Sequence, residues 1–259
     1  MTANKIAVWK KYIPLIRELV KRDLKVKYRR SFLGYVWSLL NPLLMMIVMS
    51  AVFSFIFRFD IPNYPLYLIT GQTLWTFFNE STNIAMYSII QNAALLKKIY
   101  IPKFIFPISR VISSFVTMMF SLIAILIVMV FTGVKVTWAI LLFPIPLCFL
   151  FIFCVGIGMI LSSLSVYFRD ITHLYSVVCL AWMYATPIFY PINQLSVWMQ
   201  NLMKLNPMYH FINCFRQIVL YGNVPGYNTF FGCIASSLVV LIIGLFVFNK
   251  LQKNFVSQI

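Results

Sequence analysis

Acidic side chains are scarce in this sequence of 259 residues. It contains five of them, spread along the whole chain: Glu18, Asp23, Asp60, Glu80 and Asp170. No two lie close enough in sequence to suggest the paired carboxylates of general acid–base catalysis. They also form no cluster with which a membrane glycosyltransferase would hold a metal–diphosphate. An enzyme is therefore a poor fit to this chain.

The usual motifs for metals, redox chemistry and nucleotides are missing too. The five cysteines include no C-x-x-C pair, and His173 and His210 have no accompanying ligand pattern. No G-x-x-x-x-G-K-[ST] phosphate loop occurs, so the chain does not bind ATP in the usual way. Gly156 and Gly158 form a bare G-x-G in an apolar run, which predicts close helix packing. We expect no metal and no cofactor in this chain.

Apolar side chains are abundant instead. They make up 62% of the chain, and charged residues make up 10%, whereas soluble domains are about 45–50% apolar and about 25% charged. One soluble core of this size cannot hide the excess, so a lipid bilayer is the fitting solvent. The net charge of +16 is compatible with nucleic-acid binding. The cations lie in short stretches between long apolar runs, however, which is typical of membrane topology, so no nucleic-acid partner is expected.

The apolar runs predict an all-α, polytopic membrane protein. A spanning helix needs about 20 apolar residues, and six runs qualify. Turn signals divide them, among them Asn63, Pro65 and Gly133. We place the spans near residues 36–57, 66–90, 106–131, 138–165, 172–190 and 229–249. With six spans, seventeen Lys and Arg residues fall on one side and four on the other. Since cytoplasmic connections carry the excess, both termini are predicted to lie in the cytoplasm, with the chain in the inner membrane.

The N-terminal segment is amphipathic. Its apolar residues recur at steps of three or four, and its Lys and Arg residues occupy other faces. This pattern predicts a helix lying in the membrane interface, divided into two pieces at Pro14. The apolar positions are Ile6, Trp9, Ile13, Ile16, Val20 and Leu24.

A second segment outside the spans precedes the last one. Residues 205–221 are apolar but short, and they contain Arg216. Asn206 before a proline predicts a helix start, and Gly222 predicts its end. We predict a re-entrant helical hairpin within residues 190–226. Non-helical backbone at that depth must face protein or water, which implies a pore mouth.

Three features allow two interpretations each. Glu80, an acid inside a predicted span, fits either a structural hydrogen bond to a neighbouring helix or proton coupling. Residues 91–107 fit either a short amphipathic helix that inserts into a soluble partner or a cationic loop at the membrane surface. Aromatic residues of the second and fifth spans fit either helix packing or the wall of a passage for sugars. Those of the fifth span are Tyr175, Trp182, Tyr184, Phe189 and Tyr190.

An ordered series of short motifs resembles one transporter family. The opening motif is Arg22-Asp23-Leu24-Lys25, Lys27-Tyr28, Ser31, Leu33-Gly34, Trp37 and Asn41-Pro42. Later matches include Tyr64-Pro65, Gly71, Trp75, Asn92, Lys98, Tyr167-Phe168-Arg169-Asp170, Pro187-Ile188-Phe189-Tyr190 and Asn206-Pro207. Together they are similar to the ABC-2 type permeases that export polysaccharide, among them O-antigen, capsule and teichoic acid exporters. The resemblance covers nearly the whole chain.

The resemblance implies partners and a domain layout. Residues 1–259 would form a single ABC-2 type transmembrane domain, with a gate-helix region at 1–34 and six spans over 36–249. Such permeases pair as homodimers and bind two copies of a separate ATPase subunit, which holds ATP and Mg. The cargo would be a polyprenyl-diphosphate-linked glycan or a polyol-phosphate polymer that crosses the lipid bilayer.

The resemblance also implies site residues. The cationic entrance would comprise Lys25, Lys27, Arg29 and Arg30, which attract the anionic diphosphate. Contact with the ATPase would involve Gln91, Asn92, Leu95, Leu96, Lys97, Lys98, Ile99, Tyr100 and Lys103. Channel or gate residues would be Trp37, Tyr175, Trp182, Tyr184, Phe189, Tyr190 and Arg216.

These expectations favour the permease subunit of an ATP-driven exporter of lipid-linked polysaccharide or teichoic acid. The chain itself would be a transport subunit and no enzyme. Three alternatives stay open at this point. They are an ABC-2 permease for a drug or small lipid, an ATP-independent flippase or proton-coupled carrier centred on Glu80, and a membrane glycosyltransferase.

Overall fold

A computed structural model describes residues 2–29, 31–57 and 61–258, and that part of the chain is all-helical without strands. The all-α prediction is therefore confirmed. The α-helices are α1 (Thr2–Tyr28), α2 (Trp37–Phe57), α3 (Tyr64–Met86), α4 (Ser88–Gln91), α5 (Ala93–Lys98), α6 (Ile105–Thr132), α7 (Pro144–Tyr167), α8 (Ile171–Ala185), α9 (Val197–Met203), α10 (Pro207–Val219), α11 (Tyr227–Leu251) and α12 (Phe255–Gln258). Short 3₁₀ turns lie at Gly34–Val36, Trp138–Leu142, Ile192–Gln194 and Gln252–Asn254.

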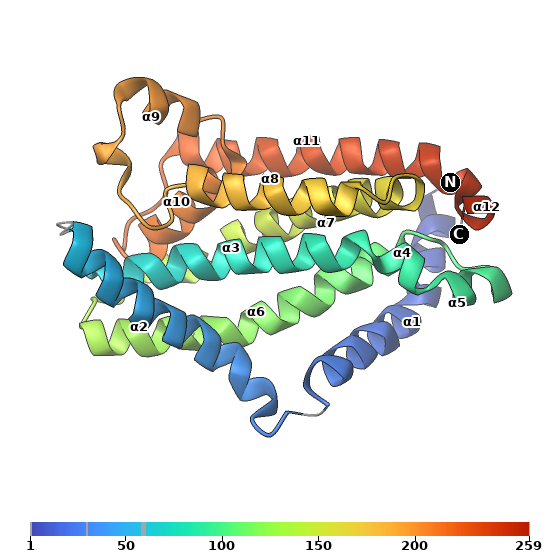
Figure 1. The fold of residues 1–259 in the computed structure, drawn as a ribbon, viewed down its shortest axis with the longest axis horizontal. Coiled ribbons are helices and arrows are strands. Elements are labelled where there is room, and N and C mark those ends of the chain that lie inside the picture. The colour runs from blue at the N-terminus through green and yellow to red at the C-terminus, as the bar shows by residue number, and fades with distance from the viewer. Residues whose placement is uncertain (1, 30, 58–60, 259) are drawn as a thin grey trace.

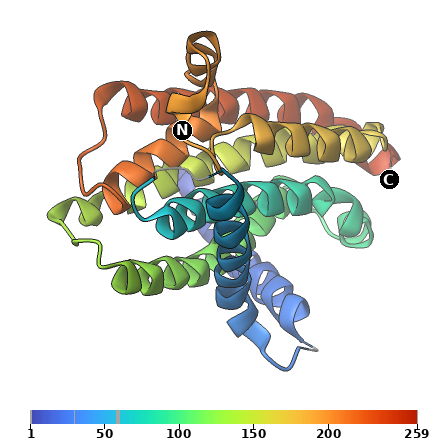
Figure 2. The same cartoon turned by 60° about the vertical axis from the view of Figure 1, so that its left-hand side comes forward.

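The long helices form one bundle. Helices α3, α6, α7, α8 and α11 run along the long axis, and α1 and α2 cross it obliquely on one side (Figures 1 and 2). Helix α7 packs against both α3 and α11, and α3 also packs against α6. The core lies where these four helices meet, and Leu68, Phe78, Phe153 and Cys154 are fully buried there.

Local sequence signals set several helix ends. Asn63 adopts a left-handed backbone conformation with φ 54°, and Pro65 follows in the first turn of α3. Gly133, also left-handed with φ 66°, ends α6. The side chain of Asn206 accepts a hydrogen bond from the Met208 backbone N–H and so caps α10. Each of these residues was a predicted turn or helix boundary.

Four helical stretches of the described chain are long and apolar enough to cross a membrane: Val36–Phe53, Ile105–Thr132, Trp138–Tyr167 and Tyr227–Asn254. Ile171–Ala185 is also an apolar helix, but it is shorter than these four. Helix α3, with 23 residues, is long enough to cross a membrane. It is not among the four because its polar side chains lower its mean hydropathy. The count of six spans stays a prediction at this point.

Both chain ends lie at the same end of the long axis, together with α5 and α12 (Figure 1). Helices α9 and α10 lie at the opposite end. An even number of crossings requires this arrangement of the termini. The side of the membrane that each end faces stays a prediction.

Helix α1 differs from the expectation in one respect. It continues through Pro14 as a single helix, although the sequence predicted a division there. The Pro14 side chain is exposed, and the packing of α1 against α6 outweighs the local cost of a proline inside a helix. On the predicted apolar face, Ile16, Val20 and Leu24 are half-buried while Ile13 is 55% exposed. Leu19, which was not assigned to that face, is buried. An interfacial position of α1 therefore stays a prediction.

The region of the predicted hairpin contains two helices. Helix α9 is short, and α10 packs into the bundle against α11, α3 and α7. The Trp182 indole N–H donates to the Asn206 side-chain oxygen over 2.9 Å and ties α8 to the start of α10. A re-entrant position in the membrane stays a prediction for this pair.

Glycines allow α7 and α11 to approach closely. A Cβ atom added to Gly156 would lie 2.7 Å from the Val240 backbone, and one added to Gly244 would overlap the Gly156 carbonyl oxygen. A Cβ at Gly158 would lie 2.9 Å from Ala85 of α3. The close packing predicted for the G-x-G pair is confirmed.

We expect Gly244→Ala to destabilise the protein by about 1–3 kcal/mol, because the added methyl group forces α7 and α11 apart. The measurement is the thermal unfolding midpoint of the detergent-purified chain. Gly226→Ala is the matched control, since a Cβ there meets nothing within 4 Å. Equal midpoints for both variants would contradict the close contact.

Candidate functional site

A buried charge cluster joins α1 to α6. The Asp23 carboxylate lies 3.0 Å from the Arg110 guanidinium and 3.1 Å from that of Arg22. Its other oxygen accepts a hydrogen bond from Ser113. Only 8% of the Asp23 side chain is exposed, so desolvation makes its two cationic partners necessary. Neither Asp23 nor Arg110 was among the site residues predicted from the sequence.

The same cluster reaches the predicted ATPase-contact segment, residues 91–103. Arg22 donates to the Asn92 side chain over 3.2 Å, and Arg110 donates to the Gln91 side chain over 2.9 Å. The N-terminal helix and this segment are thereby connected through two arginines.

Further along α1, the Lys27 ammonium lies 2.6 Å from the Glu80 carboxylate of α3. Glu80, which allowed two interpretations, therefore has a cationic partner. The side chains of Lys25 and Arg29 are exposed on the same helix. Arg30, the fourth predicted entrance residue, lies outside the described residues.

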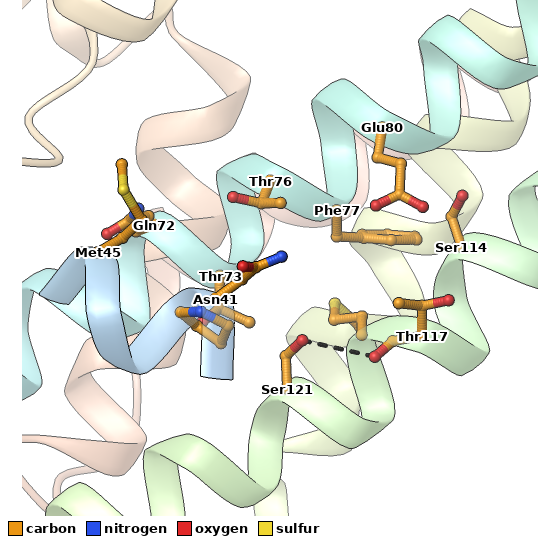
Figure 3. Close-up of a pocket in the computed structure, with 12 residues that line it drawn as sticks. Asn41, Met45, Gln72, Thr73, Thr76, Phe77, Glu80, Ser114, Thr117 and Ser121 are labelled. Atoms are coloured by element: carbon orange, nitrogen blue, oxygen red, sulfur yellow. Dashed lines mark hydrogen bonds between the residues drawn. The ribbon is translucent and has the colours of Figure 1, made fainter. Parts of the chain in front are cut away.

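A polar cavity of about 300 Å³ lies between α2, α3 and α6, and we call it the groove (Figure 3). Phe77 and Glu80 project from α3 toward Ser114 and Thr117 of α6 (Figure 3). Its lining consists of Asn41, Pro42, Met45, Gln72, Thr73, Thr76, Phe77, Glu80, Ser114, Thr117, Met118 and Ser121. Most of these are amides, hydroxyls and thioethers inside otherwise apolar helices.

A second cavity of about 410 Å³ adjoins the groove, and we call it the mouth. The two share Glu80, Ser114 and Thr117. The mouth is also lined by Lys27, Arg110 and Asp23. The Lys27–Glu80 ion pair therefore lies at the boundary between the mouth, which has charges of both signs, and the groove, in which Glu80 is the one charged side chain.

The ATPase-contact segment has a buried side and an exposed side. Leu95 and Leu96 pack against the core, while Lys97 and Lys98 are exposed. Ile99 and Tyr100 are also exposed, Tyr100 to 96%. An aromatic residue without protein contacts at the surface suits a docking role.

The C-terminal segment supports the ATPase-contact segment. The Lys103 ammonium donates to the Gln252 carbonyl over 2.5 Å and lies 5.4 Å from the centre of the Phe255 ring. Burial lowers the pKa of Lys103. The Tyr167 hydroxyl donates to the Leu251 carbonyl over 2.8 Å. Phe255 itself is fully buried.

The predicted channel or gate aromatics occupy different environments. Tyr175 is buried, and its hydroxyl donates to Thr82 over 2.6 Å. Trp182 packs edge-on against Trp75 and Phe78 in the core. The other predicted residues range from buried Phe189, through the intermediate Tyr190, to exposed Tyr184 and Trp37. Their place in a passage stays a prediction.

Arg216, the last predicted gate residue, is buried at the other end of the bundle, where it connects two segments of the chain. Its guanidinium donates to the carbonyls of Pro187, Ile188 and Tyr67 over 2.8–3.0 Å. It also lies 3.4 Å from the centre of the Tyr67 ring. Gly71 leaves room for it, because a Cβ there would lie 2.6 Å from the guanidinium. Arg216 thus fixes the non-helical backbone after α8 to α3.

Comparison with known proteins identifies the family. Residues 14–220 match the model of the ABC-2 type transporter family. This chain belongs to that family. Among its relatives, an O-antigen export system permease protein of Myxococcus xanthus is 30% identical over 96% of both chains. One of Klebsiella pneumoniae is 31% identical over 93% of both chains.

More distant relatives of this ABC-2 chain also carry export names. A capsule polysaccharide export inner-membrane protein of Neisseria meningitidis is 23% identical over 94% of this chain. The family that the sequence motifs indicated is thereby confirmed. The match extends over the groove, the mouth and Arg216, all of which lie within residues 14–220.

We expect Arg216→Met to destabilise this ABC-2 chain, because three buried carbonyls lose a donor at about 1–3 kcal/mol for each unsatisfied group. The measurement is the rate of protease cleavage within residues 186–196, which should rise together with a lower unfolding midpoint. Arg169→Met serves as the control, since Arg169 is exposed. Equal cleavage rates would show that Arg216 does not hold this backbone.

Proposed function

We propose that this chain is the membrane-spanning permease subunit of an ATP-driven exporter of lipid-linked polysaccharide. The carrying observation is the match to O-antigen export permeases over 93–96% of the chain. The polar groove within apolar helices supports it, since a polar cargo needs polar surface inside a bilayer. The same relatives favour this function over drug or small-lipid export.

The proposed topology has six spans, formed by α2, α3, α6, α7, α8 and α11. Helix α3 is about 34 Å long at 1.5 Å per residue, which exceeds a hydrocarbon core of about 30 Å. Most of its polar side chains line the groove or are buried in the core, which keeps them away from lipid. Helix α8 has 15 residues, and the chain continues beyond it to Tyr190. Both termini would then lie in the cytoplasm of the inner-membrane protein.

The proposed assembly contains two copies of this chain and two ATPase subunits. Helices α2 and α8 expose aliphatic side chains that a second copy or lipid would cover, among them Ile47, Val48, Leu174 and Val177. The ATPase, which would bind ATP and Mg, would dock on residues 91–103. In this proposal the chain is a transport subunit without catalytic residues of its own.

The proposed transport cycle begins at the cytoplasmic end. Exposed Lys25 and Arg29, together with the mouth, attract the diphosphate of the lipid-linked glycan. Closure of the ATPase pair moves residues 91–103, and the hydrogen bonds of Gln91 and Asn92 carry this movement to Arg110 and α1. The lipid tail stays in the bilayer while the glycan crosses. The gate would lie at the opposite end, near Arg216.

We expect Tyr100→Ala to weaken ATPase binding at least about ten-fold, because an exposed aromatic anchor is lost from a docking surface. Co-purification of the ATPase and export of surface polysaccharide should both fall. Tyr227→Ala is the matched control, since Tyr227 is 93% exposed at the other end of the bundle. If Tyr100→Ala retains the ATPase as wild type does, this docking surface is wrong.

We expect the double variant Lys25→Gln, Arg29→Gln to lower the export rate several-fold while the complex remains assembled, because two steering charges are removed. The measurement is the appearance of surface polysaccharide after induction. Lys11→Gln with Arg17→Gln removes the same charge from the exposed, earlier part of α1. Equal rates in both double variants would remove the entrance role from Lys25 and Arg29.

A further inference from the structure

Three of the seven buried polar side-chain atoms that lack a hydrogen bond in the described chain belong to residues of the groove. Within the described chain, Gln72 Oε1, Thr73 Oγ1 and Ser114 Oγ are buried and form no hydrogen bond. All three side chains line the groove. An unsatisfied buried polar group costs about 1–3 kcal/mol, and native structures contain few of them. A cluster of three around one cavity points to a ligand that supplies the missing hydrogen bonds.

The polar residues form two rows along the groove. On α3, Gln72, Thr76 and Glu80 follow at steps of four, so they lie above one another on one helix face. On α6, Ser114, Thr117 and Ser121 follow at steps of three and four. The two rows belong to helices that pack directly against each other. Both rows line the same cavity, so a ligand with several hydrogen-bonding groups can contact both helices.

The charged residues that line the groove and the mouth indicate which chemical class of ligand the groove can bind. The groove contains no Lys or Arg, and its one charged side chain is Glu80 at the boundary with the mouth. Glu80 would repel an anion from the groove. In the mouth, Asp23 neutralises Arg110, so an anion would be retained beside Lys27, near the exposed Lys25 and Arg29. Beyond this boundary the lining offers hydroxyls and amides, which suit a neutral ligand.

The apolar residues of the groove lining indicate that this neutral ligand is a sugar. Met45, Phe77 and Met118 interrupt the polar rows, and an aromatic or thioether surface packs well against the C–H face of a sugar ring. A volume of about 300 Å³ lies at the small end of the range for ligand pockets. The groove therefore has room for a short stretch of a glycan and no more.

We propose that the groove between α2, α3 and α6 binds the neutral sugar residues that follow the diphosphate of the lipid-linked glycan. This proposal rests on the proposed export function. Thr73, Ser114 and Gln72 hydrogen-bond the sugar hydroxyls, and the diphosphate stays on the Lys27 side of the ion pair. The groove thus binds the sugar part of the lipid-linked glycan, and the Lys27 side of the mouth binds its diphosphate.

The first test uses hydroxyl deletions that preserve shape. Thr73→Val with Ser114→Ala removes two unpartnered hydroxyls from the groove. We expect export to fall about ten-fold, because two ligand hydrogen bonds are lost. The unfolding midpoint should stay the same or rise, because no protein hydrogen bond is lost. A purely structural role would instead lower the midpoint.

Thr70→Val with Ser109→Ala is the matched control on the same two helices. Both hydroxyls donate to backbone carbonyls of their own helices, Thr70 to Leu66 and Tyr67 and Ser109 to Phe106, and neither lines the groove. This pair should lower the midpoint slightly and leave export per folded transporter unchanged. Wild-type export by the groove pair would overturn the proposal.

The second test detects the ligand directly. Thr76 is exposed and lines the groove, so Thr76→Cys gives a thiol there, in a Cys148→Ser background that removes the exposed native thiol. A membrane-permeant maleimide then labels the chain in cells that assemble the lipid-linked glycan and in cells blocked in its assembly. We expect labelling several-fold slower in the assembling cells alone.

The other outcomes each decide against the proposal. Equal, fast labelling in both cells would show an empty groove, and equal, slow labelling would show that an ordinary phospholipid fills it. The proposed export function is tested separately, by loss of surface polysaccharide in cells that lack this chain. A chain that restores export yet shows no glycan-dependent protection would retain the function and lose the groove as its sugar site.

Discussion

Polar side chains inside a membrane bundle must be satisfied by the protein itself, because lipid offers them no partner. Helix α3 depends on this constraint throughout its length. Thr70 and Thr82 donate to carbonyls of their own helix, and Glu80 pairs with Lys27. Gln72 and Thr73 keep polar atoms that no described residue satisfies. These unpaired polar atoms belong to residues that line the groove. The proposed ligand would supply the hydrogen bonds that the protein does not.

Buried charged side chains are stabilised in different ways at the two ends of the bundle. At the end that holds the termini, Arg22 and Arg110 neutralise the Asp23 carboxylate. At the other end, Arg216 has carbonyl oxygens around it, and these dipoles spread the charge without removing it. The Arg22 side chain is 45% exposed and can meet an anion from solvent, whereas the guanidinium of Arg216, bonded to three carbonyls, holds the backbone in place. The first end therefore suits reception of a charged cargo, and the second suits a stable hinge for a gate.

What the sequence could predict was local. The start of α10 at Asn206 and Pro207, the end of α6 at Gly133 and the close approach at Gly156 follow from residue types and their immediate neighbours, and all are confirmed. The partners of Glu80 and Arg216 could not be predicted, because they lie 53 and up to 149 positions away in the chain. Asp23 was missed for the same reason, since nothing near it in sequence marks its burial between α1 and α6. The division at Pro14 was wrong because α1 packs against α6, and such tertiary packing outweighs the local preference of a proline.

The contacts at the end of the bundle that holds the termini constrain how the proposed ATPase partner could act on the groove. Residues 91–103 are held on one side by Phe255 and the carbonyl of Gln252, through Lys103. On the other side, Gln91 and Asn92 bond Arg110 and Arg22, which share the Asp23 carboxylate. A push on Tyr100 therefore reaches α1 and α6 together, and α1 carries Lys27 at the boundary of the groove. Because the Lys27–Glu80 pair is partly exposed, a small displacement of α1 can separate it at low cost. Movement at the docking surface and access to the groove are then linked through one helix.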